Sequence, residues 1–287
     1  MMAACLAACG QGKAESDPLL YRVSDGQGCT VYLLGTIHMG RPDFYPLGTA
    51  AEAAYQAAEV LAVEADLLSQ SAADAARYSA ALMYSPGDEC RRHLSPETYQ
   101  LGLQRLGRSE GLLNRMRPAA WYSLAETAVF AELGCSQEWG VDSVLLHRAH
   151  DEGKLVEELE GGDAQIGILL SIPDEVMDGE IRRLLSDPDQ ARADMENALR
   201  AWQAGDADAL LAAALPSSDT PAYRLYTEAV YARRNALFAQ RVTEYLAKGR
   251  TALVAVGAAH LLGQDGLAQR LADAGYRVER LPNGQET

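Results

Sequence analysis

Two short motifs of the same form, Gly-x-x-His, stand near opposite ends of this 287-residue chain. One spans residues 35–38 and the other spans residues 257–260, and each directly follows a run of apolar residues. Histidine is a common metal ligand and a frequent acid–base group near neutral pH. In open α/β sheets, the residues after the carboxyl ends of strands project into the ligand crevice. The two motifs together therefore predict one shared site, whereas either histidine alone could be an ordinary loop residue.

A carboxylate is expected to join the two histidines, His38 and His260. The apolar run at 60–63 leads into Glu64, with Asp66 two residues later, so a third strand brings an acidic group to the same edge. Two imidazoles and a carboxylate, with one position left for water, form a common catalytic metal site. The alternative for Glu64 is a solvated strand end or a helix cap.

The glycines of the two motifs, Gly35 and Gly257, are expected to support the same site. Each follows an apolar strand and precedes its histidine by three residues. Glycine has no side chain to prevent a left-handed backbone or a close approach. At least one of the two is therefore expected to have a positive φ or to let a ligand come close.

The remaining histidines and cysteines show no established metal-binding spacing. His93, His147 and His150 lie in charged, helical surroundings. The last two are three residues apart and could bind a metal from one helix face, although a solvated face is the more ordinary interpretation. Cys90 and Cys135 could form a disulfide in an exported protein, or could be separate buried thiols.

Strand signals stand at both ends of the chain. The apolar runs at 19–23 and 31–34 are separated by Asp-Gly-Gln-Gly, which predicts an antiparallel hairpin. The runs at 60–63 and 253–256 lack polar alternation, which indicates strands covered on both faces of a parallel or mixed sheet. A further strand is expected at 277–281.

The middle of the chain, from about 71 to 247, is expected to be nearly all helix with one interposed strand at 155–158. Ser95-Pro96 and Asp187-Pro188 are typical helix starts, and alanines at helical spacing predict a helix over 49–59. The predicted fold class is therefore α/β, with a mixed sheet built from N- and C-terminal segments and a largely helical middle region.

The composition restricts the partners of the chain. With 48% hydrophobic and 23% charged residues, it resembles an ordinary folded protein. The formal net charge is −15, from 40 acidic and 25 basic residues. Such a surface repels polyanions, so nucleic acid is not expected as a partner, whereas cations and metal ions are better suited.

The first nine residues, MMAACLAAC, resemble the end of a bacterial lipoprotein signal, with Leu6-Ala7-Ala8 before Cys9. A positive start and half of the apolar segment are missing, so residues 1–17 are expected to be a truncated signal and linker. This pattern predicts lipidation at Cys9 and a periplasmic or outer-membrane lipoprotein that attaches peripherally to the membrane. The alternative is an alanine-rich terminus without such a role.

The segments around these motifs resemble the TraB/GumN family, which is related to the Tiki metalloproteases and more distantly to erythromycin esterase and the haem-binding ChaN proteins. Three segments carry the resemblance: YLLGTIHMGRPDFYPL, VLAVEADL and VAVGAAHLLGQDGLAQRLADAGYRVERL. Shorter similarities lie in the middle of the chain, at Trp139-Gly140-Val141-Asp142, Leu159-Glu160, Ala201-Trp202 and Arg233-Arg234-Asn235. The resemblance implies one domain over 18–282, followed by a tail at 283–287.

The resemblance also implies what the site contains. It places His38, His260 and Glu64 around one metal, with a basic residue at Arg234 and Asn235 beside it. Manganese or cobalt is implied as the ion, since Tiki members are described as proteases that depend on these metals. Many bacterial members have no assigned substrate.

The chemistry expected from these residues is hydrolysis by a metal-activated water, most sharply of a peptide and more broadly of a small-molecule ester or amide. Glu64 cannot be metal ligand and general base at once, and Glu160 or Asp142 could take the other role. Arg234 could hold a substrate carboxylate or a developing oxyanion. The alternative function is a non-catalytic periplasmic protein that binds or sequesters a ligand or peptide in the same crevice.

Overall fold

Strands from both ends of the chain form one six-stranded sheet in the computed structural model, which describes residues 15–26, 28–214 and 218–283. The sheet has the order β4-β3-β5-β2-β1-β6. The bounds of its strands are β1 Leu20–Ser24, β2 Thr30–Thr36, β3 Val60–Val63, β4 Leu155–Glu158, β5 Ala252–Gly257 and β6 Arg277–Arg280. β1 pairs antiparallel with β2 and β6, and the pairs β2–β5, β5–β3 and β3–β4 are parallel. The prediction of a mixed sheet from the two ends of the chain is confirmed.

The predicted hairpin is the antiparallel pair β1–β2, in which Leu20 lies opposite Leu34 and Val23 opposite Val31. The two apolar runs without polar alternation form β3 and β5, which lie inside the sheet. Every residue of β3 is buried, and so are residues 252–256 of β5. Such burial requires cover on both faces of the sheet, which is why these strands have no polar side.

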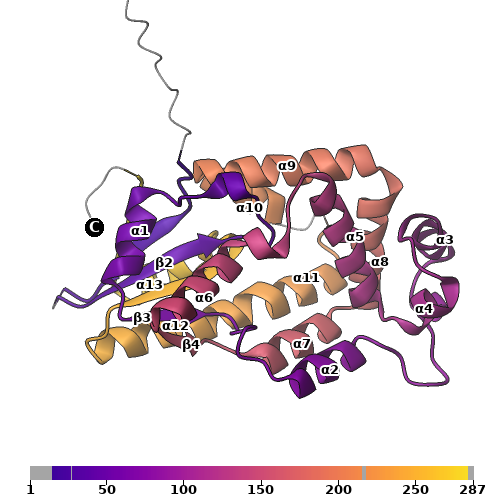
Figure 1. The fold of residues 1–287 in the computed structure, drawn as a ribbon, viewed down its shortest axis with the longest axis horizontal. Helices are drawn as coiled ribbons and strands as arrows, with labels where there is room; N and C mark the ends of the chain where they lie inside the picture. Colours follow the sequence, from indigo (N-terminus) through magenta and orange to yellow (C-terminus); the bar gives the residue numbers. More distant parts are fainter. Residues whose placement is uncertain (1–14, 27, 215–217, 284–287) are drawn as a thin grey trace, which may run out of the picture.

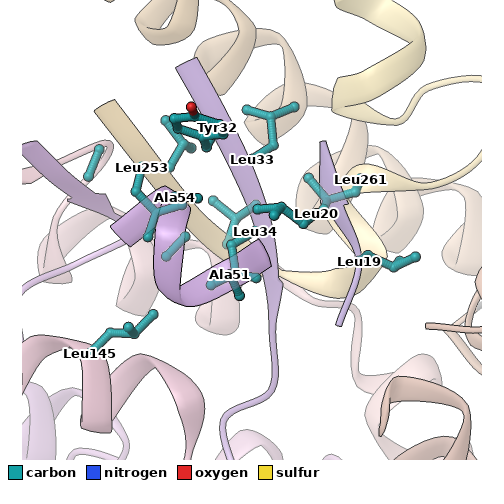
Figure 2. Close-up of a cluster of buried hydrophobic side chains, with 14 of the residues drawn as sticks. Leu19, Leu20, Tyr32, Leu33, Leu34, Ala51, Ala54, Leu145, Leu253 and Leu261 are labelled. Carbon is teal, nitrogen blue, oxygen red and sulfur yellow. The ribbon is translucent and has the colours of Figure 1, made fainter. Parts of the chain in front are cut away.

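Helix α1 supplies part of this cover. Its alanines Ala51 and Ala54 lie against the leucines of β2 and β5, among them Leu34 and Leu253 (Figure 2). Leu145 of helix α6 approaches the same cluster. Small alanine side chains let the helix lie close to the strands, so burial of these leucines stabilises the sheet.

The middle of the chain is largely helical, as predicted, and the short strand β4 interrupts it. The helices are α1 Thr49–Ala57, α2 Ala72–Ala81, α3 Pro96–Arg105, α4 Glu110–Arg115, α5 Pro118–Glu132, α6 Val141–Glu152, α7 Gly162–Ser171, α8 Asp174–Ser186, α9 Pro188–Ala204, α10 Ala207–Ala214, α11 Pro221–Thr227, α12 Arg233–Ala247 and α13 Leu267–Asp273. Short 3-10 turns are η1 Pro42–Phe44, η2 Cys90–Arg92, η3 Gln137–Trp139 and η5 Ala258–Leu261, and η4 Glu228–Ala232 is a π-helical turn.

Local signals account for two of the helix starts. The side chain of Ser95 accepts a hydrogen bond from the amide of Thr98 at the start of α3, and Asp187 does the same for Gln190 at the start of α9. Each cap satisfies an amide that has no partner within its helix. Both predicted starts are confirmed.

Two clusters of buried apolar side chains hold the molecule together. One surrounds the sheet, and the other lies among helices of the middle region, including α3, α5 and α8. Figure 1 shows these helices at the end of the molecule away from the sheet. Cys135 belongs to the first cluster and Cys90 to the second, and both are free, as is Cys29. The alternative of a disulfide between Cys90 and Cys135 is therefore wrong, and that of separate buried thiols is correct.

Several expectations about the ends of the chain are not addressed by this structure. Cys9 and most of the expected signal segment lie outside the described residues, as does the tail after residue 283. The single-domain boundaries at 18 and 282 stay a prediction. Within the described ranges, no helix is long and apolar enough to cross a membrane.

Candidate active site at the carboxyl edge of the sheet

Strands β2, β3 and β5 end at the same edge of the sheet because they run parallel. Thr36, the last residue of β2, pairs with Gly257, the last residue of β5. Val63, the last residue of β3, pairs with Ala255. The residues that follow these strands, including the predicted His38, Glu64 and His260, therefore arrive at one edge.

His260 is buried in the turn η5, with 4% of its surface exposed. Its Nδ1 lies 2.6 Å from Oδ1 of Asn235, and its Nε2 lies 2.8 Å from Nη1 of Arg234. An arginine can only donate, so we assign a neutral ring that carries its proton on Nδ1 and accepts at Nε2. Burial lowers the pKa of His260 to about 4, which agrees with this neutral form.

Arg234 links two buried carboxylates to this histidine. Its Nη2 donates to Oε2 of Glu64 at 2.6 Å, and its Nε donates to both oxygens of Glu160 at 3.1 and 3.0 Å. The exposed fractions of the three side chains are 11% for Arg234, 7% for Glu64 and 2% for Glu160. A guanidinium suits this position because its flat, forked donors can face two carboxylates at once.

Glu64 is held ionised inside this cluster. Burial alone would raise the pKa of Glu64, but nearby His260 and Arg234 and the amide of Gly257 outweigh it and lower the pKa. The Gly257 amide donates to Oε1 at 2.8 Å, and Gln165 donates to Oε2 at 3.3 Å. Because His260 is neutral near pH 7, Arg234 is the cation that balances Glu64 there.

His38 and Asp142 form a separate pair beside this cluster. The Nδ1 of His38 lies 2.8 Å from Oδ2 of Asp142, whose Oδ1 accepts a hydrogen bond from Thr36 at 2.6 Å. The Asp142 carboxylate raises the pKa of His38, although 66% of the imidazole is exposed and solvent screens the effect. Asp142 thus fixes the ring and leaves its Nε2 free to face other groups.

Two glycines allow the His38 loop to lie against the loop before α6. A side chain on Gly140 would stand 2.2 Å from the carbonyl oxygen of His38, and one on Gly40 would stand 1.9 Å from that of Trp139. The amide of Val141 donates to Ile37 at 2.8 Å. This close contact of backbones carries Asp142, at the start of α6, to His38.

The backbone conformation of the motif glycines differs from one of the two expectations stated for them. Within the described ranges, neither Gly35 nor Gly257 is among the glycines with positive φ, and Gly257 has a φ of −47°. A side chain on Gly35 would stand 3.1 Å from Ala258 and 3.2 Å from Leu19. The expectation of positive φ is therefore wrong. Gly35 instead permits the protein's own turn η5 to pack against β2.

A cavity of about 860 Å³ connects the two groups of residues. His38 and Asp142 line it, and so do Glu64 and Arg234. Its remaining wall comes largely from the helical middle, so the sheet edge supplies the polar end and the helices supply most of the apolar surface. A concave, mostly apolar space with a few converging polar groups is the usual form of a ligand site.

The structure thus brings together most of the predicted site residues in two neighbouring groups. Glu64, Glu160, Arg234, Asn235 and His260 form one hydrogen-bonded cluster. His38 and Asp142 form the other. Glu160 was one of two candidates for the proton acceptor, but both its oxygens face Arg234, so it serves to hold that arginine.

The remaining histidines lie elsewhere. His93 contacts Asp174 and Asp88, and His150 contacts Asp66 at 2.9 Å, whereas His147 is exposed on α6. Asp66 also caps the turn at Ser69 through its carboxylate. Asp66 therefore stabilises a turn.

Some residues in the cavity lining and beside His260 carry no signal in the sequence. Glu126 and Tyr122 of α5 line it, yet they stand in an ordinary helical segment. Tyr231 belongs to the π-helical turn η4, and its ring lies 5.4 Å from that of His260. Such turns are frequent at functional sites, but a single sequence does not indicate them.

The fold and the two strand-end histidine turns define a protein of the TraB/PrgY/gumN family. The family model matches residues 19–280, so the chain belongs to this family and the resemblance seen in the sequence is confirmed. The chain is 30% identical over 252 residues to the uncharacterized protein YbaP of Escherichia coli, a match that covers 84% of this chain and 87% of that protein. The YbaP protein of Shigella flexneri matches to the same extent. No solved structure matches the chain significantly.

Proposed function

We propose that this protein is a hydrolase of amide or ester bonds, with peptides as its first candidate substrates. One observation carries the proposal: the His38–Asp142 pair borders the same cavity as Glu64 and Arg234, and Arg234 contacts the buried His260. An acid–base histidine oriented by a carboxylate, facing a fixed cation across a partly dry space, is an arrangement suited to acyl transfer.

Each residue has a distinct part in this proposal. Asp142 holds Nδ1 of His38, so Nε2 is the atom available to a metal ion or to a proton from water. Arg234 presents a positive charge at the cavity wall, where it can hold the negative charge that develops on a carbonyl oxygen. Glu160 holds Arg234 in place, and Asn235 fixes the proton of His260 on Nδ1.

The donor chemistry fits a divalent ion, such as the manganese or cobalt that the family resemblance implies. Histidines that bind metals usually engage their other nitrogen with an oxygen acceptor, as His38 does with Asp142 and His260 with Asn235. His38, Glu64 and His260 would hold the ion, which when bound would supply an acidified water and polarise a carbonyl.

Binding of an ion requires the side chains of the site to rearrange. Among the described residues, no group of three or more histidine, cysteine or acidic side chains is arranged to hold a metal. Nε2 of His260 lies 3.9 Å from Oε1 of Glu64, but it accepts a hydrogen bond from Arg234. A metal–nitrogen bond of about 2.1 Å needs the same lone pair. Arg234 must therefore release His260 before an ion can bind there.

A second candidate function is a periplasmic protein that binds or sequesters a ligand without turnover. The contact of Arg234 with His260 favours it, because Arg234 already occupies Nε2 of His260 and pairs with Glu64 without any ion. A substitution at Glu64 distinguishes the two functions. In a hydrolase, the change Glu64→Gln removes turnover, whereas a binding protein has no turnover to lose.

Incubation with a diverse peptide library, followed by mass spectrometry, tests the proposal. The protein is loaded with Mn²⁺ or Co²⁺, and a parallel sample is treated with a chelator. We expect new peptide termini with the wild-type protein and none with Glu64→Gln. The matched control is Glu244→Gln, which changes a glutamate on α12 whose side chain is 35% exposed. No cleavage by any metal form of the wild type, together with none of a matching ester library, would contradict the proposal.

We also propose that the protein is exported and lipidated at Cys9. The support is the Leu-Ala-Ala-Cys pattern of residues 6–9. Mass spectrometry of the native N-terminus should find a lipid-modified Cys9 in a membrane fraction. An unmodified Met1 in a cytoplasmic fraction would be evidence against this location.

A further inference from the structure

The part of the cavity away from the sheet combines apolar surface with negative charge. Ile168, Leu169 and Ile172 line it, and Leu67 and Leu68 lie at its wall with 47% and 42% of their surfaces exposed. A contiguous apolar surface that stays open to water often marks a place where a ligand or partner binds. This wall therefore suits an apolar group of at least the size of a phenyl ring.

A carboxylate without an ion pair faces the same space. Glu126 of α5 lines the cavity and accepts a hydrogen bond from the neutral hydroxyl of Tyr122 at 2.7 Å. Within the described ranges, no arginine, lysine or histidine forms an ion pair with Glu126. Burial raises the pKa of Glu126, and the charges of His38 and Arg183, which form no ion pair with it, lower the pKa by less.

The other charges of the cavity do not supply that cation. Arg234 is engaged by Glu64 and Glu160, and His38 is engaged by Asp142. Glu180, a further carboxylate of the lining, contacts Arg183 at 3.0 Å on its own helix. The lining as a whole therefore has an excess of negative charge, and Glu126 is a partly buried carboxylate of this lining without an ion pair.

Aromatic rings complete the surroundings of Glu126. Tyr122 and Tyr226 both line the cavity. Aromatic faces attract ammonium groups, and a carboxylate beside them adds a charge-assisted hydrogen bond. A neutral hydroxyl could donate a hydrogen bond to the carboxylate but would gain neither the cation–π attraction nor the ion pair, and an anionic group would be repelled.

We propose that the cavity selects ligands in which an apolar group is joined to an ammonium group, with the apolar part against Ile168 and its neighbours and the ammonium at Glu126. The binding preference itself does not depend on the proposed function. Only the description of the ligand as a substrate rests on that function. For a peptidase, it specifies peptides with apolar residues next to a lysine side chain or a free amino terminus.

Binding of three small probes to the wild-type protein tests the inference without any turnover. The probes are 4-phenylbutylamine, 4-phenylbutan-1-ol and 4-phenylbutanoate, which share an apolar part and carry no bond to hydrolyse. By isothermal titration, the ammonium should bind about tenfold more tightly than the alcohol, and the carboxylate should bind most weakly. Equal affinity for the three probes, or tighter binding of the carboxylate, would overturn the inference even if hydrolysis is established.

Matched variants test which residues bind the ammonium group of the probe and which bind its apolar part. Glu126→Gln should remove the preference for the ammonium and leave the affinity for the alcohol unchanged, whereas Glu132→Gln, on the same helix with a side chain 56% exposed, should change neither. Ile168→Asn should weaken all three probes, whereas Leu170→Asn, two residues along α7 and outside the lining, should not. A preference that survives Glu126→Gln would show that the ammonium binds elsewhere.

Two peptides then distinguish the sources of the ammonium. Acetyl-Leu-Phe-Lys-amide carries it only on a lysine side chain, and Leu-Phe-Gly-amide carries it only at the amino terminus. If one of the two peptides binds more tightly and Glu126→Gln removes the difference, its ammonium group is the one that Glu126 binds. Acetyl-Leu-Phe-Gly-amide carries no ammonium group. If it binds as tightly as the other two peptides, the charge is not recognised and the inference is wrong.

Discussion

Nη1 of Arg234 lies 2.8 Å from Nε2 of His260, the nitrogen that a metal ion would need. The same arginine holds Glu64, the carboxylate expected to share that ion. Arg234 and the proposed metal ion would therefore compete for the same nitrogen and the same carboxylate. If the ion displaces Arg234, the site is a metal centre, and if it does not, Arg234 remains the cation of the cluster.

Replacement of Arg234 by methionine should strengthen metal binding. The change frees His260 and Glu64, so the affinity for Mn²⁺ measured by isothermal titration should rise by about tenfold. It also leaves two buried carboxylates without their cation, which should lower the free energy of unfolding by about 3–5 kcal/mol. Arg234→Met combined with Glu160→Gln should recover part of that loss.

The control for this experiment is Arg241→Met, which changes an arginine of α12 whose side chain is 44% exposed. It should alter neither Mn²⁺ affinity nor stability by a measurable amount. Metal affinity that is unchanged or lost in Arg234→Met would show that His260 and Glu64 do not form the metal site.

The two motif glycines should differ in their tolerance of alanine. A side chain on Gly35 would crowd Ala258 and Leu19, whereas one on Gly257 would make ordinary contacts of 3.6 Å with Glu64 and 3.7 Å with His260. Gly35→Ala should cost about 1–3 kcal/mol of stability through overpacking, and Gly257→Ala should cost clearly less. Thermal unfolding of both variants measures this difference, and equal losses would argue against the packing role of Gly35.

His93 should make stability depend on pH. Burial lowers the pKa of His93, but hydrogen bonds to Asp174 and Asp88 outweigh it and raise the pKa above its ordinary value. A raised folded pKa stabilises the protein fully below about pH 6.5, and this contribution is lost as the pH rises through the folded pKa. His93→Gln should therefore destabilise by about 1 kcal/mol at pH 6 and by much less at pH 9.

Chemical denaturation of the wild type and His93→Gln at the two pH values provides the measurement. The exposed His147 of α6 supplies the control, because His147→Gln should leave stability unchanged at both. A loss in His93→Gln that is the same at pH 6 and pH 9 would mean that the charge of His93 has no part in it.

Much of the sheet could be predicted because its strands are short apolar runs with clear turns between them. The parallel order of β2, β5 and β3 then places His38, His260 and Glu64 at one edge without further information. The two strand-end histidine turns are visible in the sequence for the same reason.

The support around these residues could not be predicted in the same way. Glu160 and Arg234 are 74 residues apart, and their contact depends on how α12 packs beside the loop after β4. Glu126 lies in a helix whose sequence has no motif, and it reaches the cavity only because the helices of the middle region pack around it. Gly35 packs against the protein's own turn η5, a contact that its place after an apolar strand does not indicate.

The most direct test of the central claim compares turnover and affinity for one cleaved peptide in the wild type and in Glu64→Gln, each supplied with Mn²⁺. The hydrolase account predicts that Glu64→Gln retains the dissociation constant for the peptide within about threefold and loses turnover by at least about a hundredfold, as expected when a residue acts on the reaction and not on substrate binding. Turnover by Glu64→Gln at the wild-type rate would contradict a catalytic site at Glu64.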